Sequence, residues 1–134
     1  IHAGGPGAGQ AAKICNNMML GIHMIGTCEG FAMAQRLGLD PQVFYDIVSA
    51  SSGQSWSVTS YCPVPGVGPQ TPADKDYQGG FATALMLKDL QLAMEAAEMA
   101  GTNPRMGRRA KELYEAFEAV GNGTLDFSAI IRTV

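Results

Sequence analysis

The chain has 134 residues and a mass of 14.1 kDa, which suits one domain with a core of its own and excludes two full-sized domains. Its net charge of −3 supplies no basic surface, so neither nucleic acid nor a membrane is expected as a partner. Hydrophobic residues make up 46% of the chain and charged residues only 16%, against roughly 25% in an average domain, which indicates a surface that something else covers.

Residues 10 to 36 contain no proline and are expected to form one long helix. Its apolar residues recur at helical steps: Ile14, Met18, Ile22, Ile25 and Phe31. Because its other faces are apolar too, we expect burial on more than one side, and Gly21, Gly26 and Gly30 predict the close approach of another helix backbone. The apolar run 18 to 28 is far shorter than the roughly 20 residues that cross a bilayer, so no membrane span is expected.

A second helix is expected from Pro41 to about Ser51, because Gly38 supplies a left-handed stop and Asp40 a cap before proline. Its predicted core face consists of Val43, Phe44, Ile47 and Val48.

The following segment, residues 52 to 80, is dense in glycine and proline, which predicts a long loop. Loops of that length in a compact domain are usually functional. Trp56, the only tryptophan, lies in this segment and is expected to be either a core plug or a pocket wall.

Three more helices are predicted: Phe81 to Ala100 before Gly101, one from Asn103-Pro104 to Gly121, and a short one near Asp126 to Arg132. The predicted apolar stripe of the middle one is Met106, Ala110, Leu113, Phe117 and Val120. No segment alternates with period two, so the expected fold class is all-α, a multi-helix domain built around one long central helix.

The cysteines and histidines predict neither disulfides nor a metal site. Cys15, Cys28 and Cys62 are odd in number and form no C-x-x-C pair, which favours a reducing compartment such as the cytoplasm. His2 and His23 have no partner at metal-ligand spacing, and His23 is expected to be a core histidine.

A glycine motif near the start has two interpretations. Residues 7 to 12 match G-x-G-x-x-A, and Glu29 stands twenty residues after Gly9, as in a dinucleotide-binding fingerprint. That fingerprint requires a buried strand leading into the glycines, whereas here only residues 1 to 6 precede them and Glu29 lies within the long helix. A glycine-rich turn that starts a helix is therefore favoured over a dinucleotide site.

Lys13 and Asn17 are candidate catalytic residues because they lie one helical turn apart on one face. A lysine in an apolar cleft can exchange a proton with a substrate hydroxyl, and an adjacent amide can orient that hydroxyl, which is the chemistry of an alcohol–carbonyl interconversion. By spacing alone, a lysine that reaches into solvent beside a surface asparagine is the favoured alternative.

A second candidate group lies on the helix beginning at Phe81. Its members share one face by their spacing: Phe81, Leu85, Lys88, Asp89 and Leu92. The charged pair either marks the exposed edge of an apolar stripe or points into a cleft shared with Lys13, and the spacing does not separate these alternatives.

The run G-x-x-G-x-G-x-x-x-K-x-x-x-N, residues 4 to 17, resembles the signature of the β-hydroxyacid dehydrogenase family. A second family element is matched by Phe81, Leu85, Met86, Lys88, Asp89, Leu90, Leu92 and Ala93. Further runs in order resemble the 3-hydroxyisobutyrate branch of that family: residues 13 to 17, 25 to 27, 51 to 53, 56, 63 to 67 and 76 to 81. The resemblance covers essentially the whole chain and implies a C-terminal domain like that of 6-phosphogluconate dehydrogenase.

The resemblance implies that Lys13 is the general acid and base, that Asn17, Phe81 and Asp89 bind substrate, and that Lys88 reaches the cofactor NAD. The implied reaction is the oxidation of 3-hydroxyisobutyrate to methylmalonate semialdehyde in valine degradation. Its alternatives are a related tartronate, succinic semialdehyde or glyoxylate reductase, or a non-catalytic helical dimerisation module.

The family's N-terminal Rossmann domain is not among these residues, so residues 1 to 134 are expected to be a C-terminal helical substrate and dimerisation domain that is inactive alone. The resemblance also implies a homodimer or homotetramer, located in the cytoplasm or, in a eukaryote, the mitochondrial matrix.

Overall fold

The computed structural model describes all of residues 1–134 and is built from helices. In chain order these are α1 (Ala8–Arg36), α2 (Pro41–Ser49), α3 (Trp56–Thr59), the 3-10 helix η1 (Pro72–Lys75), α4 (Thr83–Ala100), α5 (Arg105–Phe117), the π-helical turn η2 (Glu118–Asn122) and the 3-10 helix η3 (Phe127–Thr133). The only strand-like pairing is an isolated antiparallel bridge between Ala82 and Asp126. The expected all-α class is confirmed. No helix is both long and apolar enough to cross a membrane.

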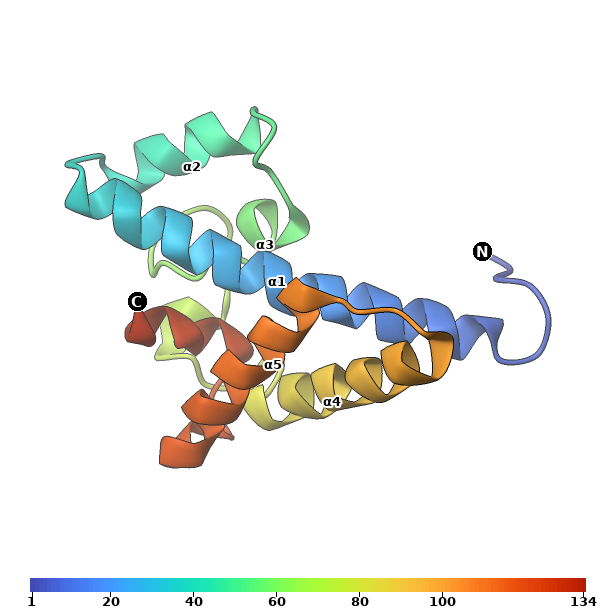
Figure 1. Cartoon of the computed structure of the whole chain (residues 1–134). Helices are drawn as coiled ribbons and strands as arrows, with labels where there is room; N and C mark the ends of the chain where they lie inside the picture. The colour runs from blue at the N-terminus through green and yellow to red at the C-terminus, as the bar shows by residue number, and fades with distance from the viewer.

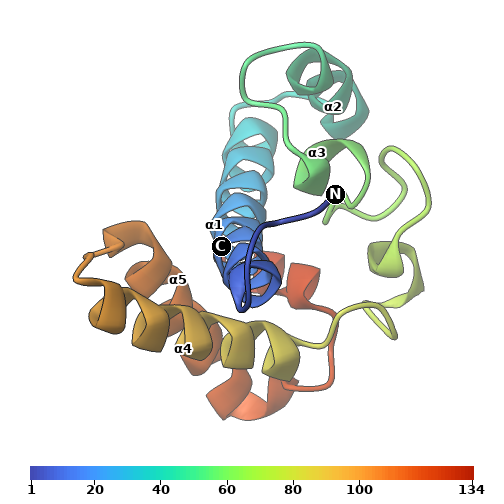
Figure 2. The ribbon, with the colours of Figure 1, turned by 90° about the vertical axis from the view of Figure 1, so that its right-hand side faces the viewer.

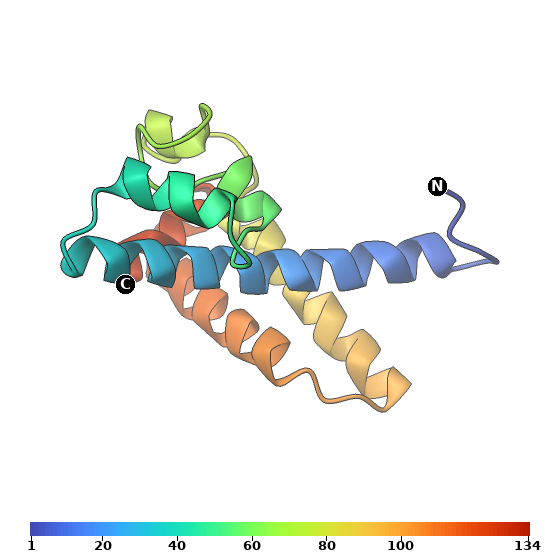
Figure 3. The same ribbon diagram turned by 90° about the horizontal axis from the view of Figure 1, so that it is seen from above.

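The long helix α1 is the axis of the molecule (Figure 1). Viewed nearly along α1, the chain forms two layers, with α2, α3 and the long loop on one side and α4 and α5 on the other (Figure 2). The first turns of α1 extend well beyond α2 and α3 (Figure 3). The expected central helix is therefore present, and its N-terminal half is covered on the α4 side only.

The helix ends follow the sequence signals. The carboxylate of Asp40 accepts hydrogen bonds from the backbone N–H groups of Gln42 and Val43, which begins α2. Gly101 ends α4 in the left-handed conformation at φ 72°. Gly7, at φ 82°, precedes the first residue of α1, so the glycine motif is the start of a helix and not a strand-to-helix turn.

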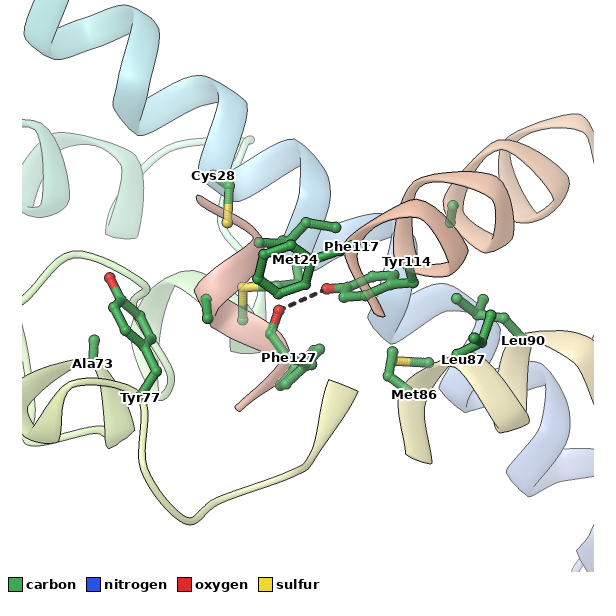
Figure 4. Close-up of a cluster of buried hydrophobic side chains, with 13 residues drawn as sticks. Met24, Cys28, Ala73, Tyr77, Met86, Leu87, Leu90, Tyr114, Phe117 and Phe127 are labelled. Atoms are coloured by element: carbon green, nitrogen blue, oxygen red, sulfur yellow. Dashed lines mark hydrogen bonds between the residues drawn. The ribbon is translucent and has the colours of Figure 1, made fainter. Parts of the chain in front are cut away.

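The main core lies where α1, α4, α5 and η3 meet. Its buried members are Met24, Cys28, Ala73, Tyr77, Met86, Leu87, Leu90, Ala110, Tyr114, Phe117, Phe127, Ala129 and Ile130. Figure 4 shows the centre of this cluster, where the hydroxyl of Tyr114 donates a 3.0 Å hydrogen bond to the carbonyl of Phe127. A smaller core under the long loop consists of Phe31, Val58, Cys62, Val64 and Val67.

The predicted core face of α2 is wrong in part. Val43 and Ile47 are 49% and 52% exposed, whereas Phe44 and Val48 pack against the loop core. The ring of Phe44 meets that of Phe31 edge-on at 4.8 Å, and this contact turns the opposite side of α2 outward. An amphipathic pattern cannot show which side of a two-sided apolar helix will be covered.

The predicted stripe of α5 is also wrong at both ends, because Met106 and Val120 are 62% and 76% exposed. Tyr114, which the pattern omitted, is fully buried one turn after Ala110. A tyrosine can be buried there because its hydroxyl has found a backbone acceptor.

The glycines of α1 meet different surroundings. A Cβ at Gly21 would lie 3.2 Å from Cδ2 of Leu90 and 3.3 Å from Cε of Met86. Its nearest neighbours are thus side chains of α4, and the expected close approach of a helix backbone is not confirmed there. At Gly26 and Gly30 a Cβ would meet nothing within 4 Å, and the same prediction is wrong for these two positions.

We therefore expect Gly21→Val to lower the free energy of unfolding by about 1–3 kcal/mol, because its side chain must displace Leu90 or Met86. Gly26→Val is the matched control, since it adds the same side chain to open space on the same helix. The measurement is urea denaturation of both variants, and equal stabilities would contradict the predicted contact.

Candidate active site

Lys13 and Asn17 lie on the side of α1 that faces α4. The amide of Asn17 donates a 2.8 Å hydrogen bond to Oδ2 of Asp89, across 72 residues of sequence. Lys13 and Asp89 line the same shallow depression of about 20 Å³, together with Gln10, Ile14, Asn17 and Leu92. Of the two alternatives for Asp89, the structure thus supports the placement beside Lys13.

The side-chain amide of Asn17 has an unused hydrogen-bond donor. Its oxygen accepts from the amide of Asn16 at 3.1 Å, and one of its two N–H groups is used by Asp89. The second N–H remains available to an oxygen of a ligand.

Lys13 and Lys88 are exposed in this chain and neither forms an ion pair. The only salt bridge joins Arg109 to Glu112. Lys13 therefore does not lie in an apolar cleft of this chain by itself, and the side of α1 and α4 that carries both ammonium groups is open.

The placement of Phe81 differs from the prediction. It precedes the first residue of α4 and therefore does not continue the helical face that carries Lys88 and Asp89. Its ring packs edge-on against Phe127 at 5.5 Å, and its backbone N–H donates a 2.7 Å hydrogen bond to Asp126. The exposed apolar residues of the face, Leu85 and Leu92, remain on α4 and are 51% and 37% exposed.

Trp56 is a wall of a hollow and not a core plug. Its side chain is 53% exposed, and its ring stacks on Tyr61 at 5.0 Å. The hollow has a volume of about 530 Å³ and is lined by Asn16, Met19, Leu20, His23, Gln54, Ser55 and Trp56. Burial and the hydrogen bond from its hydroxyl to Asp126 together raise the pKa of Tyr61.

His23 is exposed, so the prediction of a core histidine is wrong. It lies on the face of α1 that is next to α3, and it lines the hollow beside Trp56. It also lines an adjoining groove of about 460 Å³ between α1 and the segment from α2 to α3. Asn16, Met19 and His23 are spaced so that they lie on one face of α1. This spacing is the sequence signal that could have indicated that the three side chains line one surface.

Gln54, Ser55 and Asp126 were not singled out from the sequence. Gln54 and Ser55 face α1 because the loop returns there after α2, which no local pattern indicates.

Cys28 and Cys62 are buried, and burial raises the pKa of both thiols, whereas Cys15 is exposed. No group of three histidine, cysteine or acidic side chains is arranged to hold a metal ion.

Comparison with known proteins identifies the family. A family model described as "NAD-binding of NADP-dependent 3-hydroxyisobutyrate dehydrogenase" matches residues 7–134. A probable 3-hydroxyisobutyrate dehydrogenase of Mycobacterium tuberculosis is 46% identical over 134 residues, which are 100% of this chain and 45% of the relative. The human mitochondrial 3-hydroxyisobutyrate dehydrogenase is 46% identical over 132 residues, 98% of this chain and 39% of the relative.

Solved structures agree with these relatives. The Mycobacterium tuberculosis 3-hydroxyisobutyrate dehydrogenase with L-serine superimposes with a TM-score of 0.94 at 47% identity, covering 99% of this chain and 45% of that one. A 3-hydroxyisobutyrate dehydrogenase from Salmonella typhimurium gives a TM-score of 0.82 at 29% identity, covering 96% and 43%. The chain thus spans less than half the length of these relatives. It belongs to the NAD-binding 3-hydroxyisobutyrate dehydrogenase family of oxidoreductases.

Proposed function

We propose that residues 1 to 134 form the C-terminal catalytic and dimerisation domain of an NAD-dependent 3-hydroxyisobutyrate dehydrogenase that acts in valine degradation. The proposal includes a separate N-terminal Rossmann domain for NAD, because these helices contain no parallel sheet on which a dinucleotide could be held. The observation that carries it is the 2.8 Å hydrogen bond from Asn17 to Asp89 beside Lys13, which joins the two family elements into one site.

In this proposal Lys13 is the general acid and base at the substrate hydroxyl. Its amine takes the hydroxyl proton as the C–H hydrogen leaves with its electron pair, so the alcohol becomes an aldehyde and the amine becomes an ammonium group. The cofactor NAD would supply the hydride acceptor for this oxidation when bound. Because Lys13 is exposed in the chain alone, the second domain is what would remove water from around it.

Asn17, Asp89 and Phe81 orient the substrate in this proposal. Asp89 holds the amide of Asn17, whose second N–H can donate to an oxygen of the 3-hydroxy acid. Phe81 is half-buried and precedes α4, and it supplies an apolar surface for the carbon chain of the substrate.

Lys88 is the proposed contact to NAD. It lies within α4, one residue before Asp89, is exposed and has no anionic partner, so its ammonium group suits a negatively charged or hydroxyl-bearing part of a dinucleotide.

The test is an assay of the two-domain protein, meaning this chain joined to the upstream domain of its own protein. With NAD and a panel of 3-hydroxy acids that includes L-serine, we expect the highest kcat/KM for 3-hydroxyisobutyrate, and no NAD reduction by the 134-residue chain alone. A higher kcat/KM for the alcohol that corresponds to tartronate semialdehyde or to succinic semialdehyde would place the chain in a related branch. Complete inactivity would favour a dimerisation module, and activity of the chain alone would refute the division into domains.

We propose that the chain forms homodimers, or tetramers built from them, through the apolar side chains left exposed on α1, on α2 and in the turn between them. These are Met19, Met33, Leu37, Leu39, Val43 and Ile47, each at least 42% exposed. Light scattering of the 134-residue chain should give a mass of about twice 14.1 kDa or more. Ile47→Glu should shift this mass toward the monomer, and Val120→Glu, at an exposed site elsewhere, should not. A monomeric wild-type chain would contradict the proposal.

We place the protein in the cytoplasm or, in a eukaryote, the mitochondrial matrix. Its three cysteines are free, which suits a reducing compartment, and the human relative is named as mitochondrial.

A further inference from the structure

Asp126 is the one acidic residue buried completely, with an exposed fraction of 0%. Its Oδ1 accepts hydrogen bonds from the hydroxyl of Tyr61 and from the backbone N–H of Phe81, both at 2.7 Å. Its Oδ2 accepts from the backbone N–H of Ser128 at 3.0 Å and from the Ser128 hydroxyl. Four donors therefore surround this carboxylate, and no lysine, arginine or histidine forms an ion pair with it.

The two oxygens have different partners. Oδ2 caps η3 through Ser128, which is the ordinary role of an aspartate at the start of a helix. Oδ1 reaches two segments that are 65 and 45 residues away along the chain, at Tyr61 and Phe81. Capping η3 does not require these contacts.

The two partners of Oδ1 differ in their relation to the proposed site. Phe81 is a proposed substrate contact, whereas Tyr61 supports a second hollow that shares no lining residue with the depression at Lys13. The ring of Tyr61 stacks on Trp56, with 5.0 Å between the ring centres and 20° between the planes, and Trp56 forms a wall of the hollow beside α1. Phe81 precedes α4, the helix that carries Lys88 and Asp89. One carboxylate oxygen thus connects the long loop to the start of α4.

The chain next to Phe81 is shaped to let this carboxylate approach. Gly80 has a φ of +68°, and a Cβ at this position would overlap Oδ1 of Asp126 and lie 2.6 Å from the hydroxyl of Tyr61. A side chain at residue 80 would therefore displace the shared oxygen from its partners.

We propose that Asp126 is a positioning residue for the substrate side of the site, since its carboxylate determines where Phe81 and the Tyr61–Trp56 stack lie. This inference rests on the proposed function, in which Phe81 contacts substrate. Asp126 itself touches neither substrate nor cofactor, because it is enclosed by protein.

The first test uses the fluorescence of Trp56, the only tryptophan, in the 134-residue chain. Asp126→Asn retains a good cap for η3, but its single carbonyl oxygen cannot serve both Ser128 and the partners of Oδ1. Tyr61→Phe removes only the hydroxyl. Because Trp56 is 53% exposed while stacked, losing the stack should raise quenching by acrylamide roughly twofold in both variants.

The matched control is Asp40→Asn, which changes an exposed helix-capping carboxylate that contacts no aromatic ring. It should leave the quenching of Trp56 unchanged. Unchanged quenching in Asp126→Asn, or in Tyr61→Phe if Asp126→Asn does not fold, would show that Asp126 only caps η3 and would overturn the proposal.

The second test measures steady-state kinetics in the two-domain protein. Asp126→Asn should raise KM for the hydroxy acid about tenfold and leave KM for NAD unchanged, whereas a merely structural role would move neither or both. If the wild-type two-domain protein is inactive, the proposed function fails, and the quenching of Trp56 then decides alone whether Asp126 positions these aromatic residues. An unchanged KM for the hydroxy acid in an active protein would overturn the proposal that Asp126 positions residues that contact substrate.

Discussion

Replacing Lys13 with alanine in the two-domain protein should lower kcat by about 10²–10⁴-fold, the range that a general acid or base contributes. The free energy of unfolding should change by less than about 0.5 kcal/mol, because the Lys13 side chain is exposed and forms no ion pair. The measurement is NAD reduction with 3-hydroxyisobutyrate, together with urea denaturation of the same samples.

Two further variants separate proton transfer from charge. Lys13→Arg keeps a positive charge but should be as inactive as Lys13→Ala, because a guanidinium group does not release its proton in proteins. Lys75→Ala removes an exposed lysine from η1 and should retain the kcat of the wild type. A kcat of Lys13→Ala within tenfold of the wild-type value would overturn the assignment of Lys13.

Replacing Phe127 with alanine should lower the free energy of unfolding by about 3–5 kcal/mol, the usual cost of removing a buried phenylalanine ring. Phe127 is 1% exposed, and its ring lies 5.5 Å from Phe81, 5.6 Å from Tyr61 and 6.4 Å from Tyr114. Three aromatic side chains would thus lose a packing partner at once. Urea denaturation of the 134-residue chain measures the change.

Val120→Ala is the control for this core substitution, because Val120 is 76% exposed and its loss should cost less than about 0.5 kcal/mol. A loss of less than about 1 kcal/mol in Phe127→Ala would show that the aromatic cluster collapses to fill the space or is not the centre of the core.

The helix boundaries could be predicted well because their signals are local. Asp40 caps α2 through N–H groups two and three residues later, and Gly101 ends α4 by its own left-handed backbone. The covered faces could not be predicted as well. Val43 lies on the apolar side of its own helix, yet it is exposed because Phe44 meets Phe31 from another helix.

In the candidate site, too, local spacing could be predicted and long-range contacts could not. The spacing of Lys13 and Asn17 made them candidates for proton transfer, and the family resemblance favoured that role over a solvent-exposed lysine beside a surface asparagine. That Asn17 meets Asp89 depends on how α1 crosses α4. The prediction for His23 was wrong because its helix is apolar around it, whereas its side chain is exposed and lines an open hollow beside Trp56.

The low charge content of the chain is explained in part by surfaces that are apolar or open in this structure. Leu37 and Ile47 are 71% and 52% exposed, and the side of α1 and α4 that carries Lys13 and Lys88 is open. Composition could indicate that part of the surface suits a partner, but only the arrangement of α1, α2 and α4 shows where these surfaces lie.

The sequence by itself determined the all-α class and the order and approximate ends of the longer helices α1, α2, α4 and α5, because caps, glycines and prolines act within a few residues of one another. It did not predict the short helices α3 and η1, which lie in the segment expected to be a loop. Only the tertiary structure decided which faces are buried and which distant groups meet. Oδ1 of Asp126 shows the physical reason, since its two hydrogen bonds join residues 65 and 45 positions away. A buried carboxylate needs donors from whichever segments enclose it, and those segments are brought together by the packing of the whole chain.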